Sequence, residues 1–132
     1  MAMSRSKAGT DLKGVVGCLK AAGEPSRVRI LTVLEEGELC ACHLVELLGI
    51  AQPTVSRHLS ILRTAGLVDE RKNGRWVHYR LAAGGPFHRR MLRAIRDWGE
   101  QDPAVAADRE RARTFREVPV TEFCTAVRRR RS

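Results

Sequence analysis

The sequence predicts a mainly α-helical fold with one β-hairpin. Apolar residues recur at helical spacing in four successive segments between residues 11 and 65, and glycine or proline separates these segments. The spacing then changes to that of strands on both sides of Asn73-Gly74, a dipeptide typical of a tight hairpin turn. A length of 132 residues fits one such domain with a short extension.

The first four helices are predicted from their apolar faces and from the residues at their ends. A glycine follows each of them, and a proline opens the second and the fourth. In the fourth, Val55, Leu59 and Leu62 are spaced to face the core. The predicted ranges are 11–22, 25–36, 39–48 and 53–65.

A hairpin and a fifth helix follow. Strand-like runs cover residues 67–71 and 75–81, and a stripe of apolar residues from Phe87 to Trp98 predicts the helix. Two short helices joined by a tight turn and followed by a hairpin are typical of a winged helix-turn-helix. In that fold the helix at 53–65 enters the DNA major groove, and the hairpin is the wing.

The C-terminal part of the chain is predicted to be less regular. Beyond Pro103 we expect a short polar helix, and we expect the run from Arg128 to Arg131 to be solvated and disordered. The expected organisation is a flexible N-terminus at 1–10, a DNA-binding and dimerisation domain at 11–100, and an extension with a basic tail at 101–132.

Charge is unevenly distributed along this chain, whose net charge is +9. Residues 31–50 hold four acidic residues and no Lys or Arg, whereas residues 51–80 hold six basic residues against Asp69 and Glu70. The positive charge therefore begins at the fourth helix and continues through the hairpin. Nucleic acid is the expected partner of this positively charged part of the chain. The alternative is that the charge only keeps the protein soluble.

Several classes of protein are not expected. No run approaches the ~18 apolar residues of a membrane span, and the first residues lack the apolar segment of a secretory signal. The four cysteines are therefore expected to be reduced thiols in a cytoplasmic protein. The sequence has no nucleotide-binding glycine loop, no His-Glu-x-x-His motif and no Ser/His/Asp constellation, so we do not expect an enzyme.

Polar residues of the fourth helix and of the hairpin are the candidate DNA contacts. Hydroxyl, amide and guanidinium groups at the N-terminal end of a groove-binding helix reach phosphates and base edges. Each of these residues, taken alone, also fits an ordinary solvent-facing position. The predicted contacts are Gln52, Thr54, Ser56, Arg57 and His58 on the helix, with Lys72 and Arg75 on the hairpin.

Four separated stretches carry a family resemblance: Leu19 to Leu31, Gly37 to Cys42, Gln52 to Leu59, and Gly66 to Val68 continued by Gly74 to Trp76. They resemble the ArsR/SmtB family of metalloregulatory repressors, over about residues 11–100. The resemblance implies a homodimeric transcriptional repressor that binds a palindromic operator in double-stranded DNA and releases it when a metal or metalloid binds. It also implies that the first and last helices form the dimer interface. A simple intrachain core is the alternative for their apolar stripes.

Cys40 and Cys42 form a Cys-x-Cys pair directly before the predicted recognition helix. Thiolates are soft ligands and select soft ions. Residues two apart on a regular helix point about 200° away from each other, so both sulfurs can bind one ion only where the backbone departs from a helix. Glu-Leu-Cys-x-Cys resembles the site of arsenite- and antimonite-responsive members, in which trivalent arsenic takes three thiolates. Where many of them carry the third cysteine, this chain has Val45.

The third sulfur is expected from Cys124, in the C-terminal Thr-Glu-Phe-Cys segment. Cys18 is an alternative, although its spacing with Leu19 and Ala22 is typical of a buried structural thiol. A site of two thiols is a further alternative. His43 beside the pair would also fit a zinc-like site of two cysteines and one histidine.

We therefore predict a repressor that releases operator DNA when Cys40, Cys42 and Cys124 bind As(III) or Sb(III), supplied as arsenite or antimonite. Sensing of cadmium or zinc, or oxidation of the thiols, is the alternative mechanism. Two reduced structural thiols, or an architectural DNA-binding protein without an inducer, are further alternatives. The second metal site of the family, on the fifth helix, is poorly supported, because His88 stands there only with Asp97 and fits a surface histidine.

Overall fold

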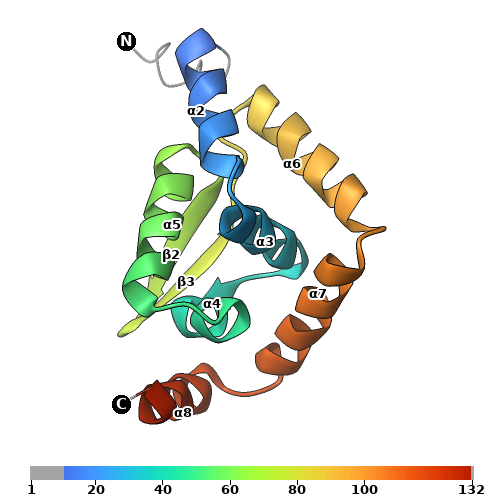
Figure 1. The fold of residues 1–132 in the computed structure, drawn as a ribbon. Coiled ribbons are helices and arrows are strands. Elements are labelled where there is room, and N and C mark those ends of the chain that lie inside the picture. The colour runs from blue at the N-terminus through green and yellow to red at the C-terminus, as the bar shows by residue number, and fades with distance from the viewer. Residues whose placement is uncertain (1–10, 132) are drawn as a thin grey trace.

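Residues 11–131 are described by the computed structural model, and the expected flexible segment 1–10 lies outside them. The helices are α2 (Leu12–Ala22), α3 (Pro25–Val33), a 3-10 turn (Leu34–Glu36), α4 (Ala41–Leu48), α5 (Gln52–Thr64), α6 (Pro86–Gly99), α7 (Pro103–Arg116) and α8 (Val120–Arg131). The strands are β1 (Leu39–Cys40), β2 (Val68–Asn73) and β3 (Trp76–Leu81), and α7 and α8 follow the edge of the molecule (Figure 1). Within the described residues, no helix has both the length and the apolar character needed to cross a membrane.

The predicted bounds of the first helix and the predicted start of the second are confirmed. The Asp11 carboxylate accepts a hydrogen bond of 2.9 Å from a backbone N–H of the first turn, and α2 ends before Gly23. Pro25 is the first residue of α3, where its fixed φ suits the helix. The α-helix ends at Val33 and tightens into the 3-10 turn. Gly37 follows with a φ of 146°, which favours glycine.

The prediction of a helix from residue 39 is wrong at its start. Leu39 and Cys40 form β1, which pairs antiparallel with β3, and α4 begins only at Ala41. In the register of the two strands Cys40 is the partner of His78. The difference has a tertiary cause, because two residues form a strand only when another strand supplies the hydrogen bonds.

The helix-turn-helix consists of α4, a turn at Gly49 and α5. Gly49 ends α4 with a left-handed φ of 68°. Val55, Leu59 and Leu62 are buried on the inner face of α5, which confirms their predicted place in the core. They belong to one apolar cluster that also includes residues of α3, α4 and the sheet. This packing fixes α5 against the domain and leaves its other face in solvent.

The predicted hairpin is confirmed as well. β2 and β3 pair as far as Asn73 with Trp76, so that Gly74 and Arg75 form a two-residue turn. The φ of 64° at Gly74 suits such a turn. The sheet order is β1-β3-β2, so the wing is hydrogen-bonded directly to the strand that ends at Cys40.

His88 on α6 is buried, so its interpretation as a surface histidine is wrong. Its Nε2 atom lies 2.6 Å from the carbonyl oxygen of Ala65, at the end of α5, and 3.0 Å from the sulfur of Cys18 in α2. The ring fits there because Gly66 has no Cβ; an added Cβ would lie 2.9 Å from Nε2. Cys18 is buried, as expected, and this contact joins α2, α5 and α6.

The C-terminal extension is more regular than predicted. The backbone forms two helices, α7 and α8, and is helical through the run from Arg128 to Arg131, which we expected to be disordered. α7 packs against α3 and α4 (Figure 1). Arg29 of α3 donates hydrogen bonds of 2.8 and 3.0 Å to the buried carboxylate of Asp108 in α7. Because part of the buried face of α7 is charged, its burial leaves a weak trace in the hydrophobic pattern.

Arg116, at the end of α7, holds the segment that leads to Cys40. Its guanidinium donates hydrogen bonds to the carbonyl oxygens of Val33, Gly37 and Glu38, at 3.1, 2.8 and 3.2 Å. Burial lowers the pKa of Arg116. These three hydrogen bonds attach the C-terminal extension to the chain just before β1.

Arg116→Met should destabilise the protein, because three carbonyl groups lose their donor while the apolar stem of the side chain is kept. We expect a loss of about 1–3 kcal/mol in the free energy of unfolding, measured by urea denaturation. Arg113→Met is the matched control on the same helix, since its ion pairs among the described residues, with Glu36 and Glu110, are solvent-exposed. Equal losses in the two variants would contradict this role of Arg116.

Candidate thiol site and nucleic-acid interface

Cys40 lies where β1 ends and α4 begins, so its backbone is extended rather than helical. It is the N-cap of α4, with φ and ψ of −87° and 167°, whereas Cys42 lies in the first turn of the helix. The two side chains are therefore not held on opposite sides of a regular helix. The departure from helical geometry that a Cys-x-Cys pair needs in order to bind one ion is present in this fold.

The structure brings Cys124 of α8 to this pair. The sulfur atoms of Cys40 and Cys124 are 3.4 Å apart, and the three sulfurs lie within 4.8 Å of one another. Cys40 and Cys124 are buried, and Cys42 is half-buried. All three belong to one chain. Cys18, the alternative third ligand, lies elsewhere, against His88.

Two phenylalanines hold α8 against α4. The ring centroid of Phe123 lies 4.6 Å from that of His43 in α4 and 4.8 Å from that of Phe115 in α7. Because Phe123 is the neighbour of Cys124, this contact places the thiol beside the start of α4; α8 lies next to α4 in Figure 1. Neither phenylalanine was singled out from the sequence. Two phenylalanines in an extension rich in charged residues were the available signal.

The pKa values of Cys40 and Cys42 are shifted in opposite directions. A hydrogen bond from the Cys42 thiol is the main cause that lowers the pKa of Cys40; burial raises it, and contact with His43 lowers it further. The same hydrogen bond, together with burial, raises the pKa of Cys42. These shifts favour the thiolate at Cys40, with Cys42 as its hydrogen-bond donor. The thiolate is the form of cysteine that binds soft ions.

His43 forms a hydrogen bond with the backbone of this site. Its Nδ1 atom accepts a hydrogen bond of 3.0 Å from the N–H of Cys40 and so caps the start of α4. Among the described residues, the group of ligand-type side chains within reach of a single ion consists of the three cysteines alone. The zinc-like arrangement with His43 is therefore not assembled. Val45, in the place of the missing third cysteine, is part of the apolar core.

The second candidate metal site, on α6, is not assembled either. The His88 ring is directed at Ala65 and Cys18. Asp97 is exposed, and its carboxylate lies 3.6 Å from the guanidinium of Arg96. The two residues therefore have separate local partners.

Most of the predicted DNA contacts are solvent-exposed. The N-terminal half of α5 presents polar side chains, and the tip of the wing adds two cations. Arg75 lies with its guanidinium 5.8 Å from the centroid of the Trp76 ring. The exposed residues are Gln52, Thr54, Ser56 and Arg57 on α5, with Lys72 and Arg75 on the wing.

His58 differs from the other predicted contacts, because its side chain is only 14% exposed. Its Nδ1 atom lies 3.0 Å from a guanidinium nitrogen of Arg27, and its Nε2 atom lies 3.4 Å from the Glu24 carboxylate. The imidazole thus ties α5 to the start of α3. This placement suits a residue that positions the recognition helix better than one that reads a base.

Cys42→Ala should raise the pH at which Cys40 becomes a thiolate, because the hydrogen-bond donor is removed. The ultraviolet absorbance of the thiolate, followed through a pH titration, measures this. Cys18→Ala is the matched control, since Cys18 is a buried thiol away from the cluster and its pKa is raised by burial. An unchanged onset of thiolate absorbance in Cys42→Ala would show that Cys42 does not stabilise the Cys40 anion.

Residues 24–70 match the family described as bacterial regulatory protein, arsR family. The arsenical resistance operon repressor of Escherichia coli (strain K12) is 48% identical over 64 residues, which are 48% of this chain and 55% of that protein. This chain therefore spans about half the length of that curated relative.

Two solved structures have a similar fold. HlyU from Vibrio cholerae N16961 is 31% identical with a TM-score of 0.60, over 67% of this chain and 95% of that chain. The homodimeric winged helix-turn-helix DNA-binding domain of a possible ArsR-family transcriptional regulator from Mycobacterium bovis is 27% identical with a TM-score of 0.59, over 74% of this chain and 87% of that one. The predicted winged helix-turn-helix is thereby confirmed. The chain belongs to the arsR family of bacterial regulatory proteins.

Proposed function

We propose that this protein is a transcriptional repressor that binds operator DNA as a homodimer and releases it when Cys40, Cys42 and Cys124 bind trivalent arsenic or antimony. The cluster of three sulfurs within 4.8 Å carries the proposal. The Escherichia coli relative is an arsenical resistance operon repressor, which supports it. In this proposal residues 11–100 bind DNA and form the dimer, and residues 101–132 complete the sensor.

The donor set fits a trivalent thiophilic ion. Soft thiolate ligands disfavour hard ions such as magnesium and calcium, and structural zinc usually takes a fourth ligand. As far as the described residues go, the cluster offers three sulfurs and no carboxylate or imidazole. Cys40 supplies a thiolate, and the other two thiols lose their protons when the ion binds. Cadmium and zinc are the competing ions.

The three cysteines connect the cluster to the DNA-binding elements. Cys40 ends β1, which is paired with β3 of the wing. Cys42 lies in α4, which packs on the recognition helix α5, and Cys124 lies in α8, which packs on α4. An ion that fixes the three sulfurs therefore acts on the wing and on α5 together. Release follows if the ion binds more tightly to an arrangement of these elements that does not fit DNA.

Exposed apolar residues on α2 and α6 support the homodimer. Large exposed apolar patches often mark interfaces between proteins. The two helices begin at the same end of the molecule in Figure 1, and Cys18 of α2 contacts His88 of α6. The similar domain from Mycobacterium bovis is homodimeric. The residues are Leu12, Val16 and Leu19 on α2 and Trp98 on α6, with 81%, 37%, 52% and 52% of their surface exposed.

Thiol oxidation is a second candidate mechanism, favoured by the 3.4 Å between the sulfurs of Cys40 and Cys124. A small movement would bring these atoms to bonding distance. Two thiols would lose two protons and two electrons to a peroxide, and a disulfide would form; hydrogen peroxide is reduced to two waters, and an organic hydroperoxide to an alcohol and one water. This mechanism needs an oxidant and no metalloid, so arsenite under reducing conditions and peroxide without arsenite distinguish the two.

Arsenite should release the protein from a fluorescent duplex of its own promoter under reducing conditions, measured by fluorescence anisotropy. Cys40→Ser, Cys42→Ser and Cys124→Ser should each raise the arsenite concentration needed for release by at least about 10–100-fold, the loss seen when a supporting residue of a metal site is removed. Cys18→Ser is the matched control and should respond as the wild type does.

Antimonite, cadmium and zinc are compared in the same assay. Release by cadmium or zinc with no response to arsenite would overturn the metalloid assignment and leave DNA binding in place. Retained DNA binding with every ion and with peroxide would instead favour a protein without an inducer.

Arg57→Ala should weaken binding to the promoter duplex by about 1–3 kcal/mol if its guanidinium reads a base. Arg93→Ala on α6 is the matched control, since Arg93 is also exposed but lies outside the predicted interface. Anisotropy on promoter and unrelated duplexes measures both affinities. Equal weakening in the two variants would show that charge alone, and not the position of Arg57 on α5, determines binding.

A further inference from the structure

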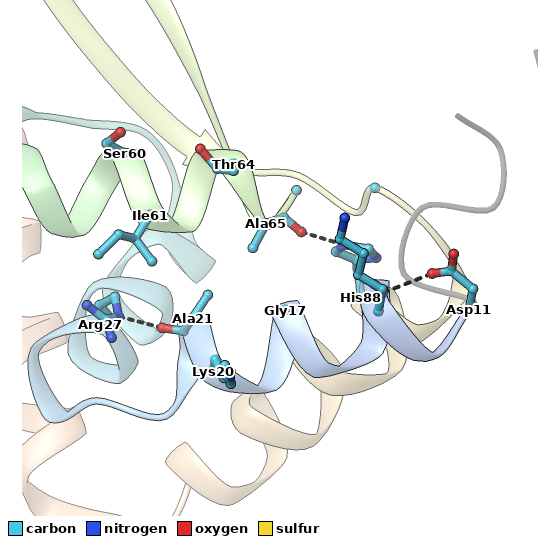
Figure 2. A pocket seen from close by; sticks show the side chains of 14 residues that line it. Asp11, Gly17, Lys20, Ala21, Arg27, Ser60, Ile61, Thr64, Ala65 and His88 are labelled. Carbon is cyan, nitrogen blue, oxygen red and sulfur yellow. Dashed lines mark hydrogen bonds between the residues drawn. The ribbon is translucent and has the colours of Figure 1, made fainter. Parts of the chain in front are cut away.

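A groove of about 670 Å³ lies between α2 and the recognition helix α5. In Figure 2, Gly17 and Ala21 of α2 lie across it from Ile61 and Ala65 of α5. Arg27 stands at one end of the groove, and His88 stands at the other. The thiol cluster does not line it. Its volume is in the range of about 300–1,000 Å³ found for pockets that bind small molecules.

The floor of the groove is apolar and built from small residues on the α2 side. Gly14, Gly17 and Ala21 leave the space open, and Ile61 forms the facing wall. A Cβ added at Gly17 would have no atom within 4 Å. Two glycines in one short helix reduce its stability. The glycines that leave this space open therefore destabilise α2, and residues that favour helix at these positions would stabilise it.

His88 provides a polar group at one end. The residue is 1% exposed and lines the groove, and its Nδ1 atom has no hydrogen-bond partner among the described residues. Its Nε2 atom already lies against the carbonyl oxygen of Ala65. A buried ring nitrogen without a partner is unfavourable, and a ligand with a polar group can pair with it.

The rim of the groove is positively charged. Lys13, Lys20 and Arg27 line it, against the single carboxylate of Asp11, which is already engaged in capping α2. The hydroxyl-bearing residues Ser60 and Thr64 of α5 also belong to the lining. An apolar floor with a cationic rim complements a molecule that has an apolar body and one acidic group.

We propose that this groove is a second effector site, which binds a small organic anion with an aromatic or aliphatic body. The body lies against the small residues of α2 and Ile61, and the acidic group lies at the rim beside Lys13 and Lys20. Because α5 carries the predicted DNA contacts, an occupant that fits only one spacing of α2 and α5 changes operator affinity. The site acts independently of the thiol cluster.

The probe is 8-anilino-1-naphthalenesulfonate, which joins an apolar ring system to a sulfonate and fluoresces in apolar surroundings. The full chain is titrated with it, and N-phenyl-1-naphthylamine, which lacks the sulfonate, is the comparison. Gly17→Leu fills the groove with a side chain that favours helix, so the variant should fold. Ala107→Leu is the matched control, since it adds the same side chain at an exposed position of α7, away from the groove.

We expect saturable binding of the sulfonate by the wild type and by Ala107→Leu, and binding at least about tenfold weaker in Gly17→Leu. The double variant Lys13→Glu/Lys20→Glu should weaken binding of the sulfonate more than that of the uncharged probe. Unchanged binding in Gly17→Leu, or equal weakening in Ala107→Leu, would show that the probe does not occupy the groove and would overturn the proposal. Binding that appears only after residues 1–9 are deleted would assign the groove to that segment and would also overturn it.

The Cys40→Ser/Cys42→Ser variant separates this site from the thiol sensor. It should bind the sulfonate as the wild type does, and the probe should change its affinity for the promoter duplex without arsenite. If arsenite fails to act on the wild type while the probe still binds and shifts DNA affinity, the thiol proposal fails and this one stands. Probe binding that leaves DNA affinity unchanged would overturn the effector role.

Discussion

The change of backbone conformation at Cys40 is the constraint on which the rest of the site depends. On a regular helix Cys40 and Cys42 would point apart, and one ion could not reach both sulfurs. The chain instead ends a strand and starts a helix at that residue. Pairing of β1 with β3 keeps Cys40 extended, and the His43 ring fixes its N–H. The position of the first thiol is thus set by the wing and by α4 together.

The C-terminal extension supplies the third thiol by a chain of contacts rather than by proximity in sequence. Arg29 and Asp108 fix α7 on α3, and Arg116 ties the end of α7 to the loop before β1. Phe123 then holds α8 on α4, which leaves Cys124 against Cys40. Each contact involves an element that also supports α5 or the wing. This arrangement would connect the proposed thiol site to the proposed DNA-binding surface.

The parts of this structure that follow from local chemistry were predictable from the sequence. Asp11 as a cap, Pro25 as a first helical residue and the turn at Gly74 depend on neighbours in the chain. The strand at Cys40 and the burial of His88 were not predictable, because they depend on β3 and on the missing Cβ of Gly66. The length of α7 was underestimated because charged residues, which are usually solvent-exposed, form part of its buried face; they are Asp108 and Arg109. Cys124 was preferred as the third ligand, but the aromatic packing that places it was not foreseen.

X-ray absorption spectroscopy at the arsenic edge, on the reduced protein loaded with one equivalent of arsenite, tests most directly whether three cysteines bind one ion. We expect three sulfur neighbours in the wild type and in Cys18→Ser, and two sulfurs with an oxygen in Cys124→Ser. Two sulfur neighbours in the wild type, or a spectrum that Cys124→Ser leaves unchanged, would contradict this expectation.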